Sequence, residues 1–398
     1  MRFLVSTGGG YGNLHPLVPL AQALADRGHA VAFAVSPAHL ATLRELGFEA
    51  FGAGPPAGAS NLTTSAYLRE LATLDLAARA RRTIEGFAAV AQLTVPDVAA
   101  AIEKWRPDAL LRDTTGWAAW IAGERADVPI AVFDFAGVPP QLIAAVASDP
   151  LQKLRAAFGL PSDPSLTTMY RWLVFVGTPP GWSDLEWLGP TVHRIQPPEF
   201  DRSPIEPHPD WLDEFAAAGP LVYATLGSVF GDSPDVWKAI FAAAAGRPSC
   251  RVVATVGRSA RLDALGPVPT NVRVESYVPQ SQVLDLAHAV IGHAGYGTLM
   301  GALRRGLPVV TLPMPAADNA GNAARVSELG AGIVVPEDRR SPEVIGDALR
   351  RVLEEPSLRD GARRVARAIE ELPPPASAAR LLEDLAKQRE PILRPPSV

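Results

Sequence analysis

The sequence has one cysteine, Cys250, among its 398 residues, and neither half has an excess of basic side chains. A single thiol excludes an intrachain disulfide framework and a zinc site built from cysteines, so a reducing compartment is expected. Residues 1–200 hold 15 basic and 18 acidic side chains, and residues 201–398 hold 22 and 24. We therefore do not expect nucleic acid as a partner, because binding it needs a positive surface.

Membrane features are missing as well. No charged and then apolar segment precedes the first strand-like run, and no apolar run approaches 18 residues without proline or charge. We expect a cytoplasmic protein that binds no membrane and acts as a monomer or homodimer. Its length and its apolar content of 47% predict two domains with buried cores.

Short apolar runs alternate with amphipathic runs of helical length in both halves. The strand-like runs are MRFLVS, AVAFAVS, DALLRD and PIAVFDF in the first half, and LVYATLGS, RVVATVG, VRVESYV, AVIGHAG and LPVVTLP in the second. This pattern is typical of βαβ units, and it predicts an α/β protein of two doubly wound, Rossmann-like domains that face each other across a cleft.

The proline-rich segment QPPEFDRSPIEPHPD, at 196–210, separates the two patterns. We assign residues 1–200 to an N-terminal domain, 201–215 to a linker, 216–375 to a C-terminal domain, and 376–398 to a C-terminal helix and tail.

The first strand runs into a glycine-rich turn, GGGYGNLHP at 8–16. A dinucleotide fingerprint needs a third glycine where Asn13 stands, and an acidic residue at the end of the second strand, where Ser36 stands. A Walker loop needs Lys followed by Ser or Thr after its glycines, and neither follows here. The turn is therefore not expected to bind a cofactor phosphate.

A second glycine-rich turn, GHAGYGT at 292–298, is the stronger candidate for phosphate binding. It places His293 directly after an apolar strand and ahead of a predicted helix, where exposed backbone N–H groups stabilise a diphosphate. The histidine adds a hydrogen bond or a charge. TLGS at 225–228 is suited to phosphate oxygens, YVPQ at 277–280 to the edge of a nucleobase, and Asp318 and Asn319 to sugar hydroxyls.

Together with NAARVSELGAG and the N-terminal GNLHPLVPLAQALADRGHAVAFA, these motifs resemble those of GT-B fold nucleotide-sugar glycosyltransferases. The closest resemblance is to the bacterial branch that glycosylates macrolides, polyketides and glycopeptides, and it covers nearly the whole chain. It implies a small-molecule acceptor in the first domain and a dTDP- or UDP-sugar in the second. It also implies inverting transfer without metal or cofactor, and the chain contains no Asp-x-Asp motif.

The resemblance also assigns site residues. Those expected at the donor are Gly227, Ser228, Val278, Gln280, His293, Gly295, Gly297, Thr298, Asp318 and Asn319. Those expected at the acceptor are Gly12, Trp117, Phe133 and Phe135, with core packing as the alternative for the aromatic residues. Residues 55–95 resemble a mobile loop and helix over the acceptor.

The base of the family is commonly a His in the first turn, oriented by an Asp at the end of a later strand. Asp113 matches the Asp, but Asn13 occupies the base position, and an amide cannot accept a proton at neutral pH. Three accounts stay open. Asn13 orients the acceptor while Asp113 or Asp134 takes the proton; His15 takes it; or the acceptor is a phenol, an amine or an electron-rich carbon that needs little basic help.

Two other functions fit the same fold. A nucleotide-sugar epimerase or hydrolase would need several acid and base groups around the sugar, and only Asp318 is evident there. A non-catalytic partner or activator of another transferase would not need the donor motifs, which are intact.

Overall fold

The computed structural model describes residues 1–55, 62, 65–203, 205–257, 260–316 and 318–395. The chain forms two compact units. Unit 1 comprises Met1–Phe200 together with Leu372–Val398, and unit 2 comprises Asp201–Glu371. The segment after Leu372 thus returns to unit 1. Each unit is built on one sheet in which every pair of strands is parallel, so the predicted fold class is confirmed.

Unit 1 contains a seven-stranded sheet of order β3-β2-β1-β4-β5-β6-β7. The strands are β1 (Arg2–Ser6), β2 (Ala30–Val35), β3 (Glu49–Gly52), β4 (Ala109–Asp113), β5 (Ile130–Asp134), β6 (Leu173–Val176) and β7 (Val192–Arg194). The four strand-like runs of the first half form β1, β2, β4 and β5. The strands that sequence analysis missed have three or four residues, a length at which apolar periodicity is a weak signal.

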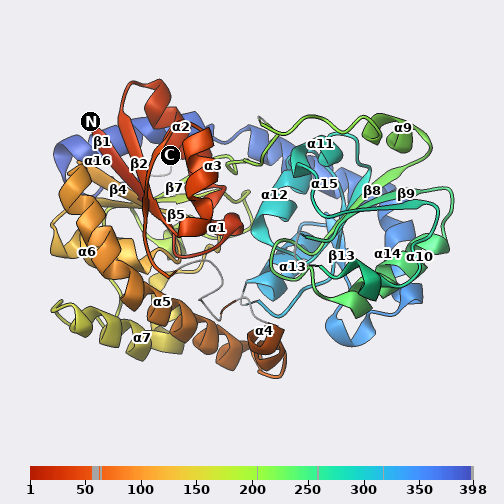
Figure 1. Ribbon diagram of the computed structural model, residues 1–398, viewed down its shortest axis with the longest axis horizontal. Coiled ribbons are helices and arrows are strands. Elements are labelled where there is room, and N and C mark those ends of the chain that lie inside the picture. Colours follow the sequence, from red (N-terminus) through yellow and green to blue (C-terminus); the bar gives the residue numbers. More distant parts are fainter. Residues whose placement is uncertain (56–61, 63–64, 204, 258–259, 317, 396–398) are drawn as a thin grey trace. The chain divides into compact units, whose positions relative to one another are not determined.

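The helices of unit 1 are α1 (Tyr11–Leu14), α2 (Leu17–Asp26), η1 (Pro37–His39), α3 (Leu40–Glu45), α4 (Ser65–Ala72), α5 (Leu76–Trp105), α6 (Trp117–Arg125), α7 (Pro140–Ala157), α8 (Leu185–Leu188), η5 (Pro375–Ser377) and α16 (Ala378–Gln388). Helix α5 packs with α6 and α7, whereas α2 packs with α16 (Figure 1). From β1 the chain continues to β2 and β3 toward one edge of the sheet, and from β4 it continues to β5, β6 and β7 toward the other edge. Right-handed crossovers in these two opposite directions put α2 and α6 on opposite faces of the sheet.

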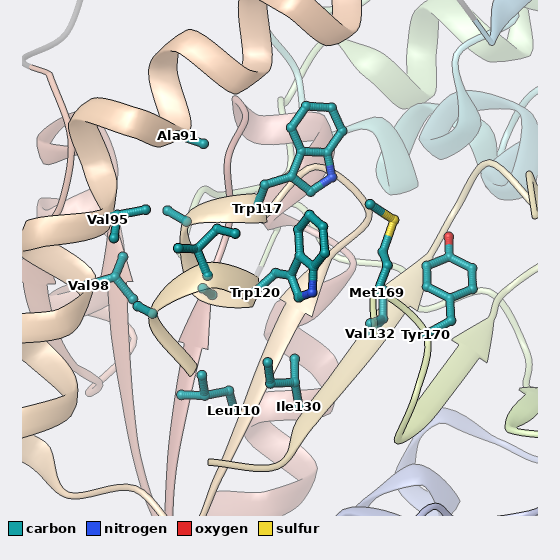
Figure 2. Close-up of a cluster of buried hydrophobic side chains, with 14 of the residues drawn as sticks. Ala91, Val95, Val98, Leu110, Trp117, Trp120, Ile130, Val132, Met169 and Tyr170 are labelled. Carbon is teal, nitrogen blue, oxygen red and sulfur yellow. The ribbon is translucent and has the colours of Figure 1, made fainter. Parts of the chain in front are cut away.

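The main core of unit 1 lies between α5, α6 and the sheet. Figure 2 shows this cluster, with Val95 and Val98 of α5 on one side and Trp117 and Trp120 of α6 on the other. Asp75 caps the start of α5, because its carboxylate accepts from Ala78 N at 2.8 Å. Burying these large side chains removes apolar surface from water and fixes α6 against the carboxyl end of β4.

Unit 2 contains a six-stranded sheet of order β10-β9-β8-β11-β12-β13. The strands are β8 (Leu221–Thr225), β9 (Arg251–Thr255), β10 (Val272–Glu275), β11 (Ala289–Gly292), β12 (Val309–Thr311) and β13 (Gly332–Val334). The helices are α9 (Leu212–Ala217), α10 (Pro234–Ala245), η3 (Leu262–Leu265), α11 (Gln280–Leu284), α12 (Tyr296–Leu303), α13 (Asn319–Glu328), η4 (Glu337–Arg339), α14 (Pro342–Glu354) and α15 (Pro356–Glu370). All five strand-like runs of the second half form strands.

Charged side chains join helix α16 to the end of α2 and the start of β2. The carboxylate of Glu383 accepts two hydrogen bonds from Arg27, at 2.5 and 2.9 Å, and lies 2.7 Å from His29 Nε2. These contacts join residues that are more than 350 positions apart in the chain. Among the residues described, no helix is long and apolar enough to cross a bilayer.

We expect Glu383→Gln to lower the melting temperature of the protein at neutral pH. Hydrogen bonds from Arg27 and then His29 lower the pKa of Glu383 from 4.5 to about 2, so the stabilisation is complete above pH 4.5 and is lost as the pH falls toward 2. The difference in unfolding free energy between wild type and variant should therefore shrink over that interval. Chemical denaturation at several pH values measures it, with the exposed Glu390→Gln as control. A pH-independent difference would contradict the prediction.

Candidate active site

The turn after β1 is held by the carboxylate of Asp113, at the end of β4. Its Oδ2 accepts from Asn13 Nδ2 at 2.8 Å, from Thr115 N at 3.0 Å and from Thr115 Oγ1 at 2.6 Å, and its Oδ1 accepts from Gly8 N at 3.2 Å. Asn13 Nδ2 also donates to Thr115 Oγ1 at 3.1 Å. The structure therefore brings Asn13 and Asp113 together, although they lie 100 residues apart.

Two glycines of this turn, Gly8 and Gly9, lie too close to Thr115 and Asn13 for a side chain. A Cβ on Gly9 would lie 2.2 Å from Asn13 Oδ1, and one on Gly8 would lie 2.3 Å from the carbonyl oxygen of Thr115. The glycines of this turn thus allow close packing of the backbone against the Asn13 side chain. Gly12, by contrast, is exposed, and a Cβ there would meet nothing within 4 Å.

Neither carboxylate suggested as a base is accessible. Asp113 and Asp134 are both 0% exposed. Asp134 Oδ1 accepts from Thr114 Oγ1 at 3.1 Å and from two backbone N–H groups, and burial raises the pKa of Asp134. The structure therefore places Asp113 and Asp134 as buried, hydrogen-bonded strand ends, with no surface available to an acceptor.

A buried arginine lies beneath the same turn. Arg112 is 0% exposed, and its Nη1 donates to the carbonyl oxygens of Asp113 and Thr114, at 2.9 and 3.3 Å. Nη2 donates to the carbonyl of Met169 at 2.8 Å. Burial lowers the pKa of Arg112 to about 10, so the guanidinium stays charged at neutral pH. The charges of Tyr170, Asp113 and Asp134 oppose this lowering of the pKa of Arg112.

The aromatic residues expected at the acceptor differ in their burial. Trp117 is 3% exposed and belongs to the core cluster of Figure 2, and Phe133 is 0% exposed within β5. Their rings fill the interior of unit 1, which favours the core-packing alternative for these two residues, and their role at the acceptor stays a prediction. Phe135 is half-buried, one residue beyond β5. His15 is half-buried too, with ring centroids 5.5 Å from Tyr11 and 5.2 Å from Phe200.

The loop expected over the acceptor falls partly outside the described residues, which exclude 56–61 and 63–64. The rest of that segment forms α4 and most of α5.

In unit 2, His293 follows β11, and its ring lies in a slot between two glycines. A Cβ on Gly295 would lie 2.2 Å from His293 Nε2, and one on Gly227 would lie 2.6 Å from His293 Cε1. Gly227 also has a φ of +70°, a conformation that disfavours other residues. The strand-end turns after β8 and β11, which carry the motifs TLGS and GHAGYGT, therefore meet at His293.

His293 is neutral in this environment. Burial lowers the pKa of His293 to about 4, and the backbone of Thr225 opposes the shift. At neutral pH the ring therefore supplies one N–H donor and no positive charge. Of the two roles expected for His293, a hydrogen bond or a charge, the structure without a bound donor favours the hydrogen bond.

The first turn of α12 continues directly from His293. Gly295 is its N-cap, and the first N–H groups of a helix have no acceptor within the helix. Thr298 Oγ1 donates to Gln280 Oε1 at 2.9 Å, and Gln280 Nε2 donates to the carbonyl of Gly297 at 3.4 Å. The structure thus brings Gln280, predicted to border the nucleobase, together with Gly297 and Thr298, predicted to hold the diphosphate.

The remaining donor-side residues lie at neighbouring strand ends. Ser228 is exposed in the turn after β8, and Val278 is 5% exposed ahead of α11. Asp318 is the N-cap residue of α13 and is half-buried, and burial raises the pKa of its carboxyl group. Asn319 is 2% exposed at the first position of that helix.

Some residues of both sites were missed in the sequence. Thr115 shares the hydrogen bonds of Asp113, and Asn322 donates to Asp318 Oδ2 at 3.2 Å. A signal existed for each: Thr115 is a hydroxyl residue two positions after a strand-ending Asp, and Asn322 follows Asp318 by one helical turn. Within the described part of the chain, no three His, Cys, Asp or Glu residues are grouped as metal ligands. Metal-independent transfer stays a prediction.

Known proteins share this sequence and fold. Residues 241–385 match the family described as Erythromycin biosynthesis protein CIII-like, C-terminal domain. The chain is 27% identical to the 4'-demethylrebeccamycin synthase of Lentzea aerocolonigenes, over 92% of this chain and 94% of that protein. It is 26% identical to the 3-alpha-mycarosylerythronolide B desosaminyl transferase of Saccharopolyspora erythraea, over 98% of this chain and all of that protein.

Solved structures agree in fold. The glycosyltransferase SnogD from Streptomyces nogalater superposes with a TM-score of 0.75 at 27% identity, over 97% of this chain and 99% of that one. The glycosyltransferase VinC, solved in complex with dTDP, has a TM-score of 0.75 at 24% identity, over 98% of this chain and 100% of that one.

The two parallel sheets, the strand-end sites and these similarities define the protein as a glycosyltransferase of the GT-B fold. Residues 241–385 match the EryCIII-like C-terminal domain, and the chain is similar over nearly its whole length to a 4'-demethylrebeccamycin synthase and a desosaminyl transferase. The comparisons thus support glycosyl transfer over the epimerase, hydrolase and non-catalytic alternatives.

We expect Gly227→Ala to displace the His293 ring, because the added methyl group would lie 2.6 Å from His293 Cε1. The pKa of His293 should then rise from about 4 toward the ordinary value of 6.5, as the ring moves into water. An NMR pH titration of the ring protons, assigned with His293→Gln, measures this.

Gly266→Ala is the matched control. Gly266 has a φ of +76°, close to the +70° of Gly227, but the nearest atom to its Cβ would be Lys238 Cγ at 3.8 Å. Both variants therefore bear a similar backbone strain, and only Gly227→Ala should move the His293 titration. An equal effect of both, or of neither, would rule out the slot as the cause.

Proposed function

We propose that this glycosyltransferase is an inverting, metal-independent enzyme that moves a sugar from a dTDP- or UDP-sugar to a hydrophobic small-molecule acceptor. One observation supports the donor site most directly: His293 lies in a glycine slot immediately ahead of the first turn of α12. A structural neighbour solved in complex with dTDP supports a thymidine diphosphate sugar.

On the donor side, the reaction needs a group that stabilises the departing diphosphate. The N–H groups at the start of α12 and the His293 ring point to the same turn, so both would donate to phosphate oxygens. A neutral ring would donate its N–H to a phosphate oxygen, and the negative charge of the diphosphate would in turn raise the pKa of the histidine. Stabilisation would therefore increase as the bond between the sugar and the phosphate breaks.

On the acceptor side, the question is which group takes the proton of the acceptor, and the burial of the two carboxylates bears on it. Asp113 and Asp134 are fully buried, and Asp113 already accepts four hydrogen bonds. We therefore propose that Asn13 orients the acceptor and that the acceptor itself is a phenol, an amine or an electron-rich carbon. Such an acceptor attacks the anomeric carbon with little help from a base. His15, which is half-buried near Tyr11 and Phe200, is the alternative base.

We expect dTDP or UDP to raise the melting temperature of the wild-type protein and to have a much smaller effect on His293→Gln. The variant replaces the ring in the slot and removes its contact with the diphosphate. A thermal-shift titration with both nucleotides measures this, and His208→Gln, whose side chain is 44% exposed in the wild type, is the control. If no nucleoside diphosphate stabilises the wild-type protein, the proposed donor site is wrong.

We expect Asn13→His to increase transfer to an aliphatic alcohol relative to transfer to a phenol. The imidazole would replace an amide that is 2.8 Å from Asp113 Oδ2, and would so create a His-Asp pair able to accept a proton. The gain for the alcohol should be about 100-fold, the lower end of what a general base contributes. Initial rates on a matched alcohol and phenol measure it.

Two further variants complete the Asn13 test. Asn13→Ala should lower the rate on both acceptors, because it removes orientation without removing a base. His15→Gln should leave the rate nearly unchanged; a loss of about 100-fold or more would instead identify His15 as the base.

A further inference from the structure

The turn that carries His293 contains a strained residue. Ala294 has a φ of +68°, and it is the only residue other than glycine with a positive φ among those described in unit 2. An L-residue in this conformation brings its Cβ close to the backbone, so surrounding contacts must hold it there. Ala294 is 1% exposed and lies between His293 and the N-cap residue Gly295.

One side-chain amide holds this turn from the side of α13. Asn322 is 3% exposed, and its Nδ2 donates to the carbonyl oxygen of Ala294 at 3.0 Å. The same atom donates to Asp318 Oδ2 at 3.2 Å. Both protons of the amide are therefore used, one on the strained turn and one on the carboxylate at the N-cap of α13.

We infer that Asn322 is a positioning residue that sets the spacing between the two parts of the donor site. It keeps Ala294 in its left-handed conformation, and so keeps the His293 ring against Gly227 and Gly295. It also fixes the carboxylate of Asp318, the residue expected to contact the donor sugar. The inference rests on the proposed donor function, and it assigns to Asn322 no contact with the substrate.

The chemistry of the amide explains why other residues would not serve. An aspartate at position 322 has no N–H to donate, and its charge would face both the Ala294 carbonyl and the Asp318 carboxylate. A serine has one proton and a shorter side chain, so it cannot reach both acceptors. Loss of either hydrogen bond leaves a buried oxygen without its donor.

The experiment compares Asn322→Ser with a matched control, Asn271→Ser. Asn271 is also 3% exposed, and its Nδ2 donates to the carbonyl oxygens of Ala244, Arg247 and Cys250 at 2.9, 3.1 and 3.1 Å, away from the donor motifs. Both variants should lower the melting temperature. Only Asn322→Ser should weaken dTDP or UDP binding, by about tenfold, the effect of roughly one lost buried hydrogen bond. Isothermal titration of the folded proteins measures this.

A second substitution tests the mechanism and covers the case in which Asn322→Ser does not fold. Glycine adopts a φ of +68° without strain, so Ala294→Gly should make the turn less dependent on Asn322. The double variant A294G/N322S should therefore fold and recover most of the nucleotide affinity. A purely structural role of Asn322 predicts no such recovery of binding.

The outcomes separate the inference from the proposed function. Wild-type protein that binds neither dTDP nor UDP overturns the proposed donor site and the inference together. Wild-type binding that is unchanged in Asn322→Ser, or an equal loss in Asn271→Ser, overturns the inference alone. Absence of rescue by Ala294→Gly also overturns it. Weaker binding in Asn322→Ser only, with rescue by Ala294→Gly, supports it.

Discussion

The carboxylate of Asp113 is the contact on which the acceptor-side turn depends. At the carboxyl edge of a parallel sheet, the chain leaves its strands and backbone N–H groups lose their ladder partners, so each needs another acceptor. Asp113 accepts from the backbone of Gly8 and Thr115 and from two side chains, one of them Asn13. The same saturation explains why it is a poor candidate for a base: its oxygens are occupied, and it has no exposed surface.

Unit 2 uses the same edge in a different way. In unit 1 a carboxylate accepts hydrogen bonds at this edge. In unit 2 the glycines Gly227 and Gly295 have no side chains there, and the His293 ring occupies the space. The ring is desolvated there, which keeps it neutral and leaves the backbone N–H groups at the start of α12 facing the turn. The two units thus share a sheet topology, whereas the strand ends offer a carboxylate acceptor in unit 1 and a histidine ring beside a helix N-terminus in unit 2.

Much of the fold follows from local pattern. All strands of five or six residues, such as β1, β2 and β8, were predicted. Strands of three or four residues were predicted only in part: β10, β11 and β12 were, and β3, β6, β7 and β13 were missed. Aromatic residues near a strand end were harder to place. Trp117 and Phe133 are next to chemically important positions in the sequence, yet both rings point into the core of unit 1. Sequence spacing does not say which side of a turn faces solvent.

By itself, the sequence determined the two-sheet α/β class, the GHAGYGT turn, and the fact that an amide stands at position 13. These are properties of neighbouring residues. Only the tertiary structure decided that Asp113 is saturated and that His293 is neutral, and only it showed that α16 joins unit 1 through Glu383. Solvation and hydrogen-bond saturation depend on partners as far apart as Asn13 and Asp113, at a separation of 100 residues, and no local pattern records such a partner.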